Sequence, residues 1–422
     1  MTSSQTTLVL GLGASGLAAA EFLLSQGAKV LGIDSNRAHL ETRLQSLGLQ
    51  VQHDSDPIDW NTIGRLIVSP GIDPKTAIYA QAKKRGVEII GEAELALRHF
   101  KKPMVAVTGT NGKTTVTLMV EHILNAAGIK AKALGNVGMP LCSYLLHPGD
   151  EEAFVVELSS YQLETMHTPV FDAAVILNIT PDHLERYPSM HEYAEAKCRL
   201  QFLLKGGAPL FVQTEAAREF SSLLLAKNYQ TFEKVEDLIP LQYRVKHDRE
   251  NVLAAWILCR PFSISNEQFC KALETFRKPP HRIEFVREVD GVSFYDDSKG
   301  TNIDAVCQAV GVMQGPVILI AGGVDKGASY LMWKEAFLGK VKKIIAIGEA
   351  APKIYRELHP YFNIKLADSL SSAVEAAAGE AEKGDFVLLS PGCSSFDMFR
   401  DYAHRGEEFQ YYVAQIEGRR GL

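Results

Sequence analysis

The segment from Val107 to Thr115, Val-Thr-Gly-Thr-Asn-Gly-Lys-Thr-Thr, contains the residue types that bind a phosphate group. A phosphate-binding loop needs consecutive backbone N–H groups, a lysine for the terminal phosphates and a hydroxyl group for magnesium. The residues that meet these needs are Gly109, Thr110, Asn111 and Gly112 for the loop, Lys113 for the charge, and Thr114 or Thr115 for the hydroxyl. Two residues separate the glycines here, whereas the general P-loop pattern has four. The sequence therefore predicts a short variety of phosphate loop.

A second glycine turn, Gly11-Leu-Gly-Ala-Ser-Gly16, fits the pattern G-x-G-x-x-G, and Asp34 stands at the end of the next predicted strand. In a dinucleotide-binding fold such glycines let the backbone approach a pyrophosphate, and the acid binds a ribose. This unit ends within about 95 residues, which is short of the two halves of a full dinucleotide site. We therefore expect a half-site for a nucleotide diphosphate, with Ser69 at the same sheet edge. A complete NAD domain and a purely structural turn are the alternatives.

A carboxylate follows the phosphate loop at the end of an apolar strand. Glu157 ends the run Ala153-Phe-Val-Val-Glu, and a carboxylate there is a natural ligand for Mg²⁺, which prefers hard oxygen ligands. A helix-capping or ion-paired glutamate is the alternative. Farther along, His183 precedes a predicted helix that contains Lys197. By spacing alone, a single lysine in an amphipathic helix is a solvated residue.

The elements that position these residues alternate along the chain. Short β-branched runs are predicted as strands at 7–10, 29–34, 65–69, 104–108, 153–158, 173–178, 292–295, 316–321, 342–347 and 385–389, with helix-length amphipathic segments between them. This alternation predicts an α/β protein built on parallel sheets that are covered on both faces. The polar stretch 98–103 and the pair Pro279-Pro280 interrupt it, so we expect three domains, at 1–95, 96–279 and 280–422.

Composition limits the classes of function. The chain has 422 residues, 46% of them hydrophobic and 22% charged, with a formal net charge of -6. A nucleic-acid-binding surface normally shows a basic excess, so none is expected. The N-terminus has no cationic segment followed by an apolar core, and no apolar run approaches the roughly 18 residues of a membrane helix, so we expect a cytoplasmic protein that does not bind membranes. The six cysteines are scattered without a CxxC pair, which predicts reduced thiols and no zinc site.

Taken together, the motifs resemble those of one family over essentially the whole chain. The blocks TGTNGKTT, ELSSYQLE, NITPDHLERY, HDRENVLAA, PPHRIE and DDSKGTNIDA are similar to the successive signatures of the Mur ligases, ATP-dependent amide-forming enzymes of bacterial peptidoglycan precursor synthesis. The resemblance implies a Rossmann-like N-terminal domain, a P-loop ATPase-like central domain and a Rossmann-like C-terminal domain. The further blocks GLGASG, SPGI, GGVDKG and SPGCSSFDMFRDYAHRGEEF are most similar to the members that add D-glutamate.

The resemblance assigns a nucleotide to each glycine turn: the UDP of the acceptor, UDP-N-acetylmuramoyl-L-alanine, at the N-terminal turn, and ATP at the central loop. The γ-phosphoryl group of ATP would pass to the acceptor's terminal carboxylate, and the amine of D-glutamate would then attack the acyl phosphate. The family pattern places one Mg²⁺ on Thr114 and Glu157. It makes Lys197 a carbamate that binds a second Mg²⁺ together with His183, and a carbamate explains a lysine beside a cation. Catalytic roles are thereby implied for Lys113, Glu157, His183, Lys197 and Lys299.

The same resemblance implies the residues that contact the three substrates. ATP contacts beyond the loop residues 109–115 are Asn251, Arg282 and Asp297. The UDP-substrate contacts are Gly13, Ala14, Ser15, Ser35, Asn36, Ser69, Asn136 and Ser159. The D-glutamate contacts are Lys299, Thr301, Lys326, Ser395, Phe396 and Tyr402. Two positions depart from the family pattern: Tyr402 replaces a phenylalanine, and Asn36 and its neighbours replace a Thr-Arg pair. The lysines supply the positive charge that a dicarboxylate needs.

Two further expectations follow, and three other classes of protein remain as alternatives. We expect a monomer, and a hinge near Pro279-Pro280 that brings Arg282 and Asp297 to the nucleotide on closure. An NAD-dependent oxidoreductase would explain the first glycine turn and Asp34 but would leave the phosphate loop without a role. A nucleotide-gated binding protein would use the loop as a switch and need no third pocket. A folylpolyglutamate-synthase-like ligase shares the loop type, but it is not expected to have an N-terminal nucleotide-diphosphate domain.

Overall fold

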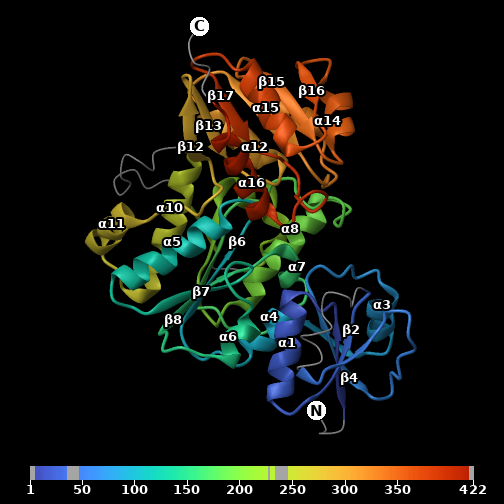
Figure 1. Cartoon of the computed structure of the whole chain (residues 1–422). Helices are drawn as coiled ribbons and strands as arrows, with labels where there is room; N and C mark the ends of the chain where they lie inside the picture. The colour runs from blue at the N-terminus through green and yellow to red at the C-terminus, as the bar shows by residue number, and fades with distance from the viewer. Residues whose placement is uncertain (1–4, 36–46, 227–228, 233–245, 418–422) are drawn as a thin grey trace. The chain divides into compact units, whose positions relative to one another are not determined.

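The computed structural model describes residues 5–35, 47–226, 229–232 and 246–417 of the chain. Three separate sheets organise these residues, one in each third of the chain (Figure 1). The described chain forms two compact units, of which the first contains Met1–Ile179 and His191–Phe276, and the second contains Thr180–Met190 and Arg277–Leu422. The N-terminal and central sheets both belong to the first unit.

The N-terminal sheet is parallel throughout, with the strand order β3-β2-β1-β4-β5. Its strands are β1 (Thr6–Leu10), β2 (Lys29–Ile33), β3 (Gln50–Gln52), β4 (Ile63–Val68) and β5 (Glu88–Gly91), and its helices are α1 (Ala14–Ser25), α3 (Ala77–Lys84) and α4 (Glu92–Leu97). Chain order runs outward from β1 in both directions, so right-handed crossovers place α1 and α3 on opposite faces. Figure 1 shows these two helices on either side of β2 and β4.

The central sheet is also parallel and has the order β11-β10-β9-β6-β8-β7. Its strands are β6 (Met104–Thr108), β7 (Ala131–Gly135), β8 (Ala153–Glu157), β9 (Ala173–Ile176), β10 (Leu210–Gln213) and β11 (Tyr229–Phe232). Its helices are α5 (Lys113–Ala126), α6 (Leu141–Leu146), α7 (Ser160–Leu163), α8 (Met190–Cys198), α9 (Thr214–Glu219), α10 (Lys246–Cys259) and α11 (Asn266–Thr275), with the 3-10 turns η1 (Arg199–Leu203), η2 (Ser221–Leu223) and η4 (Arg260–Phe262). The strands β6, β8 and β9 are fully buried, as expected for central parallel strands covered on both faces.

The C-terminal sheet has the order β12-β13-β17-β14-β15-β16 and is parallel except for its antiparallel edge pair β12–β13. Its strands are β12 (Glu284–Val289), β13 (Val292–Asp296), β14 (Val317–Gly322), β15 (Val341–Ile347), β16 (Ile364–Leu366) and β17 (Phe386–Leu389). Its helices are α12 (Ile303–Val312), α13 (Trp333–Phe337), α14 (Ala351–Leu358), α15 (Leu370–Glu380) and α16 (Tyr402–Ala414), with the 3-10 turn η5 (Tyr330–Met332).

Alternation along the central strands explains why this sheet has helices on both faces. Leu319 and Ile344 pack into one buried cluster with α12, α13 and α14, whereas their neighbours Ile320 and Ile345 pack into another with α15 and α16. Successive side chains of a strand point to opposite faces, so a strand that is apolar at every position needs a cover on each side. The run Val317–Gly322 meets that condition, since all six of its residues are buried.

The expected fold class is confirmed: the chain is α/β, with three mainly parallel sheets. All ten predicted strand runs coincide with observed strands, with ends that differ by one or two residues. The domain limits 1–95, 96–279 and 280–422 stay a prediction. All six cysteines lie among the described residues, and none of them forms a disulfide. In the described part of the chain, no helix has both the length and the apolar character that crossing a bilayer requires.

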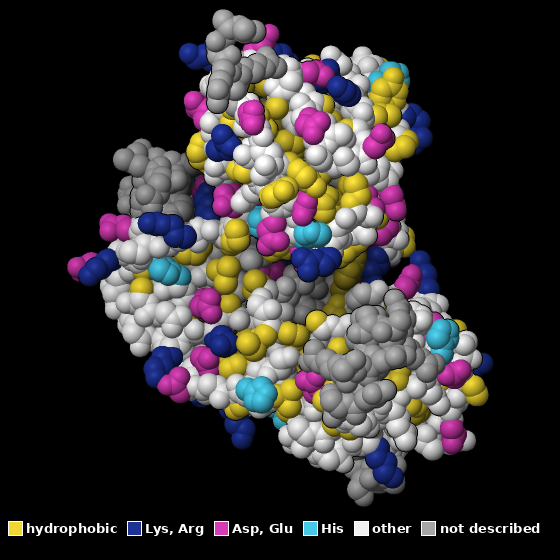
Figure 2. All heavy atoms as spheres, in the orientation of Figure 1, with side chains coloured by type: hydrophobic (Ala, Val, Ile, Leu, Met, Phe, Trp, Pro, Cys, Tyr) yellow, Lys and Arg dark blue, Asp and Glu magenta, His cyan; other side chains and the backbone are white. Residues whose placement is uncertain are grey.

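Positive and negative side chains are mixed on the face of the molecule that Figure 2 shows. Lys, Arg, Asp and Glu alternate there in small groups, which agrees with the small net charge of -6. This face therefore shows no strongly charged surface among the described residues.

Candidate active site

The phosphate loop lies between β6 and α5, in the strand-loop-helix arrangement that its sequence predicts. Two of its residues have the left-handed backbone that favours glycine, Gly109 with φ 154° and Gly112 with φ 85°. Gly112 is also the N-cap of α5, so the loop ends where the first free amide groups of that helix begin. A helix N-terminus reached through a glycine loop is a site for an anion.

Asn178 fixes the shape of this loop, and sequence reasoning gave that residue no role. Its side-chain Oδ1 accepts hydrogen bonds from the backbone amides of Thr110 (3.1 Å) and Asn111 (2.7 Å). Its Nδ2 donates to the carbonyl of Asn111 at 3.1 Å, and its own carbonyl accepts from Thr110 at 2.8 Å. Asn178 follows β9, the neighbour of β6, which explains how a residue 67 positions away reaches the loop.

Two lysines donate to the same stretch of loop. Lys113 donates its Nζ to the carbonyls of Gly109 (2.9 Å) and Thr110 (2.8 Å). Lys197, from α8, is only 1% exposed and donates to the Gly109 carbonyl at 2.8 Å, with its Nζ 4.6 Å from the centroid of the Tyr193 ring. The structure therefore brings Lys197 to the phosphate loop, and spacing alone had indicated a solvated lysine.

Glu157 ends β8 in register with Val107 of β6, so its carboxylate lies at the edge of the sheet where the phosphate loop begins. The residue is 1% exposed. One carboxylate oxygen, Oε1, accepts from the Asn136 amide at 2.7 Å, and the other, Oε2, is buried without a hydrogen-bond partner among the described residues. Burying a carboxylate oxygen unpaired is costly. A hard cation would satisfy this oxygen, so the residue fits the Mg²⁺ role predicted from sequence.

The hydroxyl groups at the start of α5 and one amide from α10 complete this edge. Thr114 and Thr115 are both buried, and the Thr115 hydroxyl has no hydrogen-bond partner among the described residues. Asn251 lies directly over the loop: a Cβ atom added to Gly112 would be 2.3 Å from its Oδ1. The first unit thus contains residues 109–115, Asn136, Glu157, Lys197 and Asn251.

The N-terminal glycine turn is packed more tightly than the phosphate loop. A Cβ atom on Gly16 would lie 1.8 Å from the carbonyl oxygen of Gly11, so α1 approaches the turn too closely for any side chain. The Ser69 hydroxyl donates to that same carbonyl at 2.7 Å, and the Asp34 carboxylate accepts from the Leu12 amide at 2.7 Å. Asp34, expected on a ribose, thus also holds the turn itself.

A cavity of about 270 Å³ lies at the carboxyl end of this sheet. Gly11, Asp34, Ser35, Ile72 and Thr76 are among its lining residues. The predicted UDP contacts Gly13 and Ala14 are exposed and Ser15 is half-buried at the start of α1, with Ser69 half-buried after β4. Asn36 lies outside the described residues.

Two predicted acceptor contacts lie on the central sheet. Asn136 is exposed, and its contact with Glu157 joins the predicted acceptor site to the predicted metal site. Ser159 is the N-cap of α7, where its hydroxyl accepts from the Gln162 amide at 3.2 Å. The capping role explains a serine at this position whether or not a ligand is bound.

In the second unit, the residues predicted to contact the nucleotide lie around Asp297. Its carboxylate accepts from the Ser390 hydroxyl at 2.7 Å and from the Ile283 amide at 3.3 Å. Burial raises the pKa of Asp297 to about 7, and the nearby charge of Arg282 acts in the opposite direction on that pKa. Arg282 itself has a buried Nε without a hydrogen-bond partner among the described residues. An unsatisfied guanidinium N–H next to a carboxylate is suited to an anionic or hydroxyl-bearing ligand.

The predicted D-glutamate lysines lie in two different environments. Lys326 donates to the Asp182 carboxylate at 2.9 Å and to the Thr301 hydroxyl at 3.4 Å. Lys299 places its Nζ 3.9 Å from the centroid of the Tyr402 ring, so this tyrosine provides a cation–π contact that a phenylalanine would also provide. Asp182, which sequence reasoning left without a role, also accepts from the Asn302 amide at 3.4 Å.

The remaining predicted residues of the second unit differ in exposure. Ser395 is 2% exposed, whereas Phe396 is 73% exposed. His183, whose backbone has a φ of 57°, has its Nδ1 3.2 Å from Glu185. It belongs to the second unit, whereas Glu157 and Lys197 belong to the first. Of the predicted metal ligands, Thr114, Glu157 and Lys197 therefore belong to the first unit and His183 to the second.

These observations define a class of protein: an α/β protein with a phosphate loop, a buried carboxylate suited to a cation, and a second glycine turn on a sheet of its own. Sequence comparison gives the family. Residues 5–91 match the MurD-like N-terminal domain of Mur ligases, residues 107–256 the Mur ligase middle domain, and residues 281–393 the glutamate ligase domain of Mur ligases. The chain therefore belongs to the Mur ligase family and is an ATP-dependent, amide-forming ligase.

Several relatives match almost end to end. A protein of Protochlamydia amoebophila (strain UWE25) named UDP-N-acetylmuramoylalanine–D-glutamate ligase is 48% identical over 96% of this chain and 97% of its own. A protein of the same name from Chlamydia caviae (strain ATCC VR-813 / DSM 19441 / 03DC25 / GPIC) is 36% identical over 99% of both chains. Among solved structures, UDP-N-acetylmuramate-alanine ligase MurC of Thermotoga maritima shares the fold, with a TM-score of 0.61 at 18% identity over 97% of this chain and 100% of its own.

Proposed function

We propose that this chain adds D-glutamate to UDP-N-acetylmuramoyl-L-alanine at the expense of ATP, in the cytoplasmic synthesis of peptidoglycan precursors. The relatives named UDP-N-acetylmuramoylalanine–D-glutamate ligase match the chain over nearly its whole length. The structural observation that carries the proposal is the buried, unpartnered Glu157 oxygen beside a phosphate loop to which two lysines donate. That arrangement is suited to moving a phosphoryl group, since such transfer depends on positioning and on neutralising charge.

The reaction has two steps. The acceptor's terminal carboxylate attacks the γ-phosphorus of ATP, the bond from that phosphorus to the β–γ bridging oxygen breaks, and ADP leaves. The amine of D-glutamate then attacks the carbonyl carbon of the acyl phosphate, and phosphate leaves as the amide forms. Within the first unit, Lys113 neutralises charge on the terminal phosphates, while residues 109–112, Thr114 and Thr115 hold them through amide and hydroxyl groups. Asn251 contacts the nucleotide from above Gly112, and Arg282 and Asp297 contact it from the second unit.

Magnesium fits the residues of this edge. Thr114 and Glu157 would hold one ion, and His183 with a carbamate on Lys197 would hold a second. Bound Mg²⁺ neutralises the phosphate oxygens and the carboxylate that is being activated. Lys197 is buried and donates to the loop carbonyl of Gly109, which supports a role for this side chain at the phosphate loop. His183 also orients the acceptor carboxylate.

The acceptor and the amino acid have separate sites. The uridine diphosphate lies on the glycine turn, with Gly13, Ala14, Ser15, Ser35, Asn36 and Ser69 as its contacts, and the sugar-alanine part reaches Asn136 and Ser159. D-Glutamate binds in the second unit, where its contacts are Lys299, Thr301, Lys326, Ser395, Phe396 and Tyr402. Lys326 forms an ion pair with the Asp182 carboxylate, which supports a site for a carboxylate group.

We further propose three domains with the limits 1–95, 96–279 and 280–422, a monomeric enzyme, and a hinge near Pro279-Pro280. The compact units divide between Phe276 and Arg277, close to that proline pair. Small-angle scattering with an ATP analogue and the acceptor is expected to show compaction. An unchanged radius of gyration would contradict the hinge.

A phosphate-release assay tests the function. The purified chain is incubated with ATP, Mg²⁺ and UDP-N-acetylmuramoyl-L-alanine, together with each member of a panel of D- and L-amino acids. Sustained release with D-glutamate, and formation of the acceptor-glutamate amide, is the expected result. Release that is independent of the amino acid, or that requires a different one, would overturn the substrate assignment. Lys197→Ala should regain part of its activity with short carboxylic acids, and an inactive variant without such rescue would contradict the carbamate.

A further inference from the structure

The segment that carries Arg282 has an unusual backbone. His281 has a φ of 60° and Ile283 a φ of 49°, so two residues with side chains take the left-handed region on either side of Arg282. A β-branched isoleucine is particularly unfavourable there. Such a conformation persists only when surrounding contacts hold it, and it is typical of functional sites.

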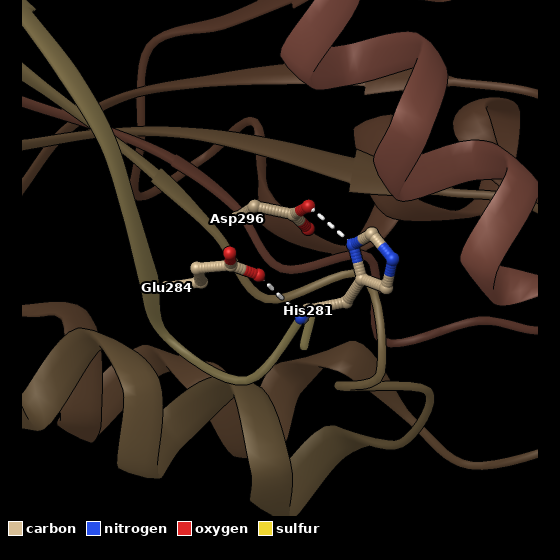
Figure 3. Close-up of side chains that lie close together, drawn as sticks. All are labelled: His281, Glu284 and Asp296. Atoms are coloured by element: carbon tan, nitrogen blue, oxygen red, sulfur yellow. Dashed lines mark hydrogen bonds and ion pairs between the residues drawn. The ribbon is translucent and has the colours of Figure 1, made fainter. Parts of the chain in front are cut away.

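Three carboxylates provide those contacts, and Figure 3 shows two of them, Glu284 and Asp296. The His281 ring lies with its Nδ1 2.6 Å from Asp296, and the His281 amide donates to Glu284 at 2.8 Å. The third carboxylate, Asp297, accepts from the Ile283 amide at 3.3 Å. Glu284 and Asp296 pair across the antiparallel strands β12 and β13, which explains why both reach the same histidine. Backbone and side chain of the segment are thus tied to one sheet edge.

The cluster of His281, Glu284 and Asp296 is compact enough to hold a cation, but both oxygens of Asp296 and one oxygen of Glu284 already accept hydrogen bonds. Asp296 accepts from His281 and, at 2.9 Å, from the Gln410 amide through Oδ2, and from the Ser298 amide at 2.9 Å through Oδ1. Glu284 accepts from the His281 backbone. Each bond holds a neighbouring segment in place, so the geometry indicates a positioning network rather than a metal site.

Gly406 of α16 packs against this hydrogen-bond network. A Cβ atom on Gly406 would lie 2.2 Å from His281 Nδ1, 2.7 Å from its Cε1 and 2.8 Å from Asp296 Oδ2. The φ of Gly406 is not in the left-handed region, so the requirement for glycine here is space and not backbone conformation. Gln410, which donates to Asp296, lies one turn further along the same helix. The helix α16 can therefore pack directly against His281 and Asp296 only because residue 406 has no side chain.

We propose that Gly406, His281 and Asp296 form a positioning device for Arg282, and that the absence of a side chain at Gly406 sets the approach of this arginine to the nucleotide. His281 and Asp296 act through the backbone of residues 281–283, and α16 holds them in place. The inference rests on the proposed function, in which Arg282 contacts ATP. The inference adds Gly406, His281 and Asp296 as residues that contact no substrate but determine the affinity for ATP.

The decisive variant is Gly406→Ala. Its matched control is Gly379→Ala, because Gly379 is also a helical glycine of the same unit and an added Cβ there would meet no atom within 4 Å. We expect Gly406→Ala to raise the KM for ATP at least tenfold with a smaller change in kcat, while Gly379→Ala keeps both near the wild-type values. The KM for D-glutamate should be nearly unchanged in both variants.

A second variant restores the space. His281→Asn has a smaller side chain, and asparagine tolerates the left-handed region. The double variant His281→Asn/Gly406→Ala should therefore have the KM for ATP of His281→Asn alone, which is lower than that of Gly406→Ala. Combined with Arg282→Ala, Gly406→Ala should add less than its own effect, since it acts through that arginine. Thermal unfolding of every variant shows whether it is folded.

The outcomes are distinguishable. A folded Gly406→Ala with the KM for ATP of Gly379→Ala overturns the proposal, as does an effect of Gly406→Ala that adds fully to that of Arg282→Ala. If Gly406→Ala does not fold, His281→Asn alone decides: an unchanged KM for ATP in that folded variant overturns the proposal, and a raised one supports it. If the wild-type chain releases no phosphate with D-glutamate, the proposed function fails instead. ATP affinity measured directly by calorimetry then tests the positioning of Arg282 with the same variants.

Discussion

The two glycine turns of the first unit share a strand-turn-helix geometry but differ in charge. At the N-terminal turn, the contacts described are neutral or acidic: Ser69 donates to Gly11, and Asp34 accepts from Leu12. At the central loop, Lys113 and Lys197 both donate to Gly109. Backbone amides alone suffice to hold a diphosphate that does not react, whereas a phosphoryl group in transfer needs fixed cations. The same backbone motif is thus specialised by the side chains around it.

The largest effect is expected when the positive charge of the central loop is removed. Lys113→Ala should reduce turnover by roughly 10³-fold or more, because it removes a fixed cation from the reacting phosphates. Binding of UDP-N-acetylmuramoyl-L-alanine at the other turn should be unchanged in calorimetry. Lys132→Ala, on β7 and ion-paired with Glu151 at 3.4 Å, serves as the control. Loss of acceptor binding in Lys113→Ala would contradict the separation of the two sites.

The second effect tests the shape of the loop with its charge unchanged. Gly112→Ala combines a φ of 85° with a contact of 2.3 Å to Asn251, whereas Gly128→Ala combines a φ of 89° with open space. Both variants carry similar backbone strain, of about 1 kcal/mol or more. Only Gly112→Ala should also raise the KM for ATP, by roughly tenfold or more, since Asn251 must move. Equal KM values in the two variants would show that the contact with Asn251 is irrelevant to ATP binding.

A smaller effect is expected at Asn178, whose side chain holds the backbone of the phosphate loop. Asn178→Ala releases the amides of Thr110 and Asn111, and losing such bonds costs about 1 kcal/mol each, so the KM for ATP should rise roughly tenfold. Asn125→Ala is a matched control, since Asn125 bridges the backbone of Ala131 in the same way at 3.0 and 3.1 Å but far along α5 from the loop. Comparable loss of thermal stability with a changed KM only in Asn178→Ala is the expected result.

The last effect concerns stability rather than activity and tests the connection between the two sheets that carry these turns. Glu92 begins α4 and accepts from the Cys142 amide at 2.6 Å, and burial raises its pKa from 4.5 to about 7. Because the folded state keeps this proton to a higher pH, its contribution to stability is full below pH 4.5 and is lost as the pH rises through 7. The loss is on the order of 3 kcal/mol.

Glu92→Gln should remove that decline. Its midpoint of thermal unfolding should fall less between pH 5 and pH 8 than that of the wild type, by roughly a few degrees. The exposed Glu274→Gln on α11 should follow the wild-type curve. Parallel curves for wild type and Glu92→Gln would exclude this carboxyl as the source of the pH dependence.

Sequence patterns predicted the sheets and the two turns well for a physical reason. Fully buried parallel strands are continuous apolar runs, and a phosphate loop is a contiguous motif, so both are visible in one short stretch. Glu157 was found because it ends such a run.

Contacts between distant segments were not visible. Asn178 reaches the loop from another strand, Asp182 binds Lys326 across 144 positions, and Gly406 packs on His281 from another helix. No local pattern encodes such pairs, because the sheet order decides them. Asp34 differs from these residues, because its motif predicts a contact with a ligand. The structure adds a role that the motif does not show, since the carboxylate also accepts a hydrogen bond from the Leu12 amide of the glycine turn.

The donation of two ammonium groups to the carbonyl of Gly109 has a consequence for how the enzyme responds to its medium. Both ammonium groups face peptide dipoles, which are weak counter-charges, and the charge of Lys113 remains when Lys197 is a carbamate. A triphosphate that replaces these dipoles gains mainly long-range Coulomb attraction, which dissolved ions screen within about 10 Å at 0.1 M. Ionic strength should therefore govern occupancy of the central loop far more than occupancy of the neutral turn near the N-terminus.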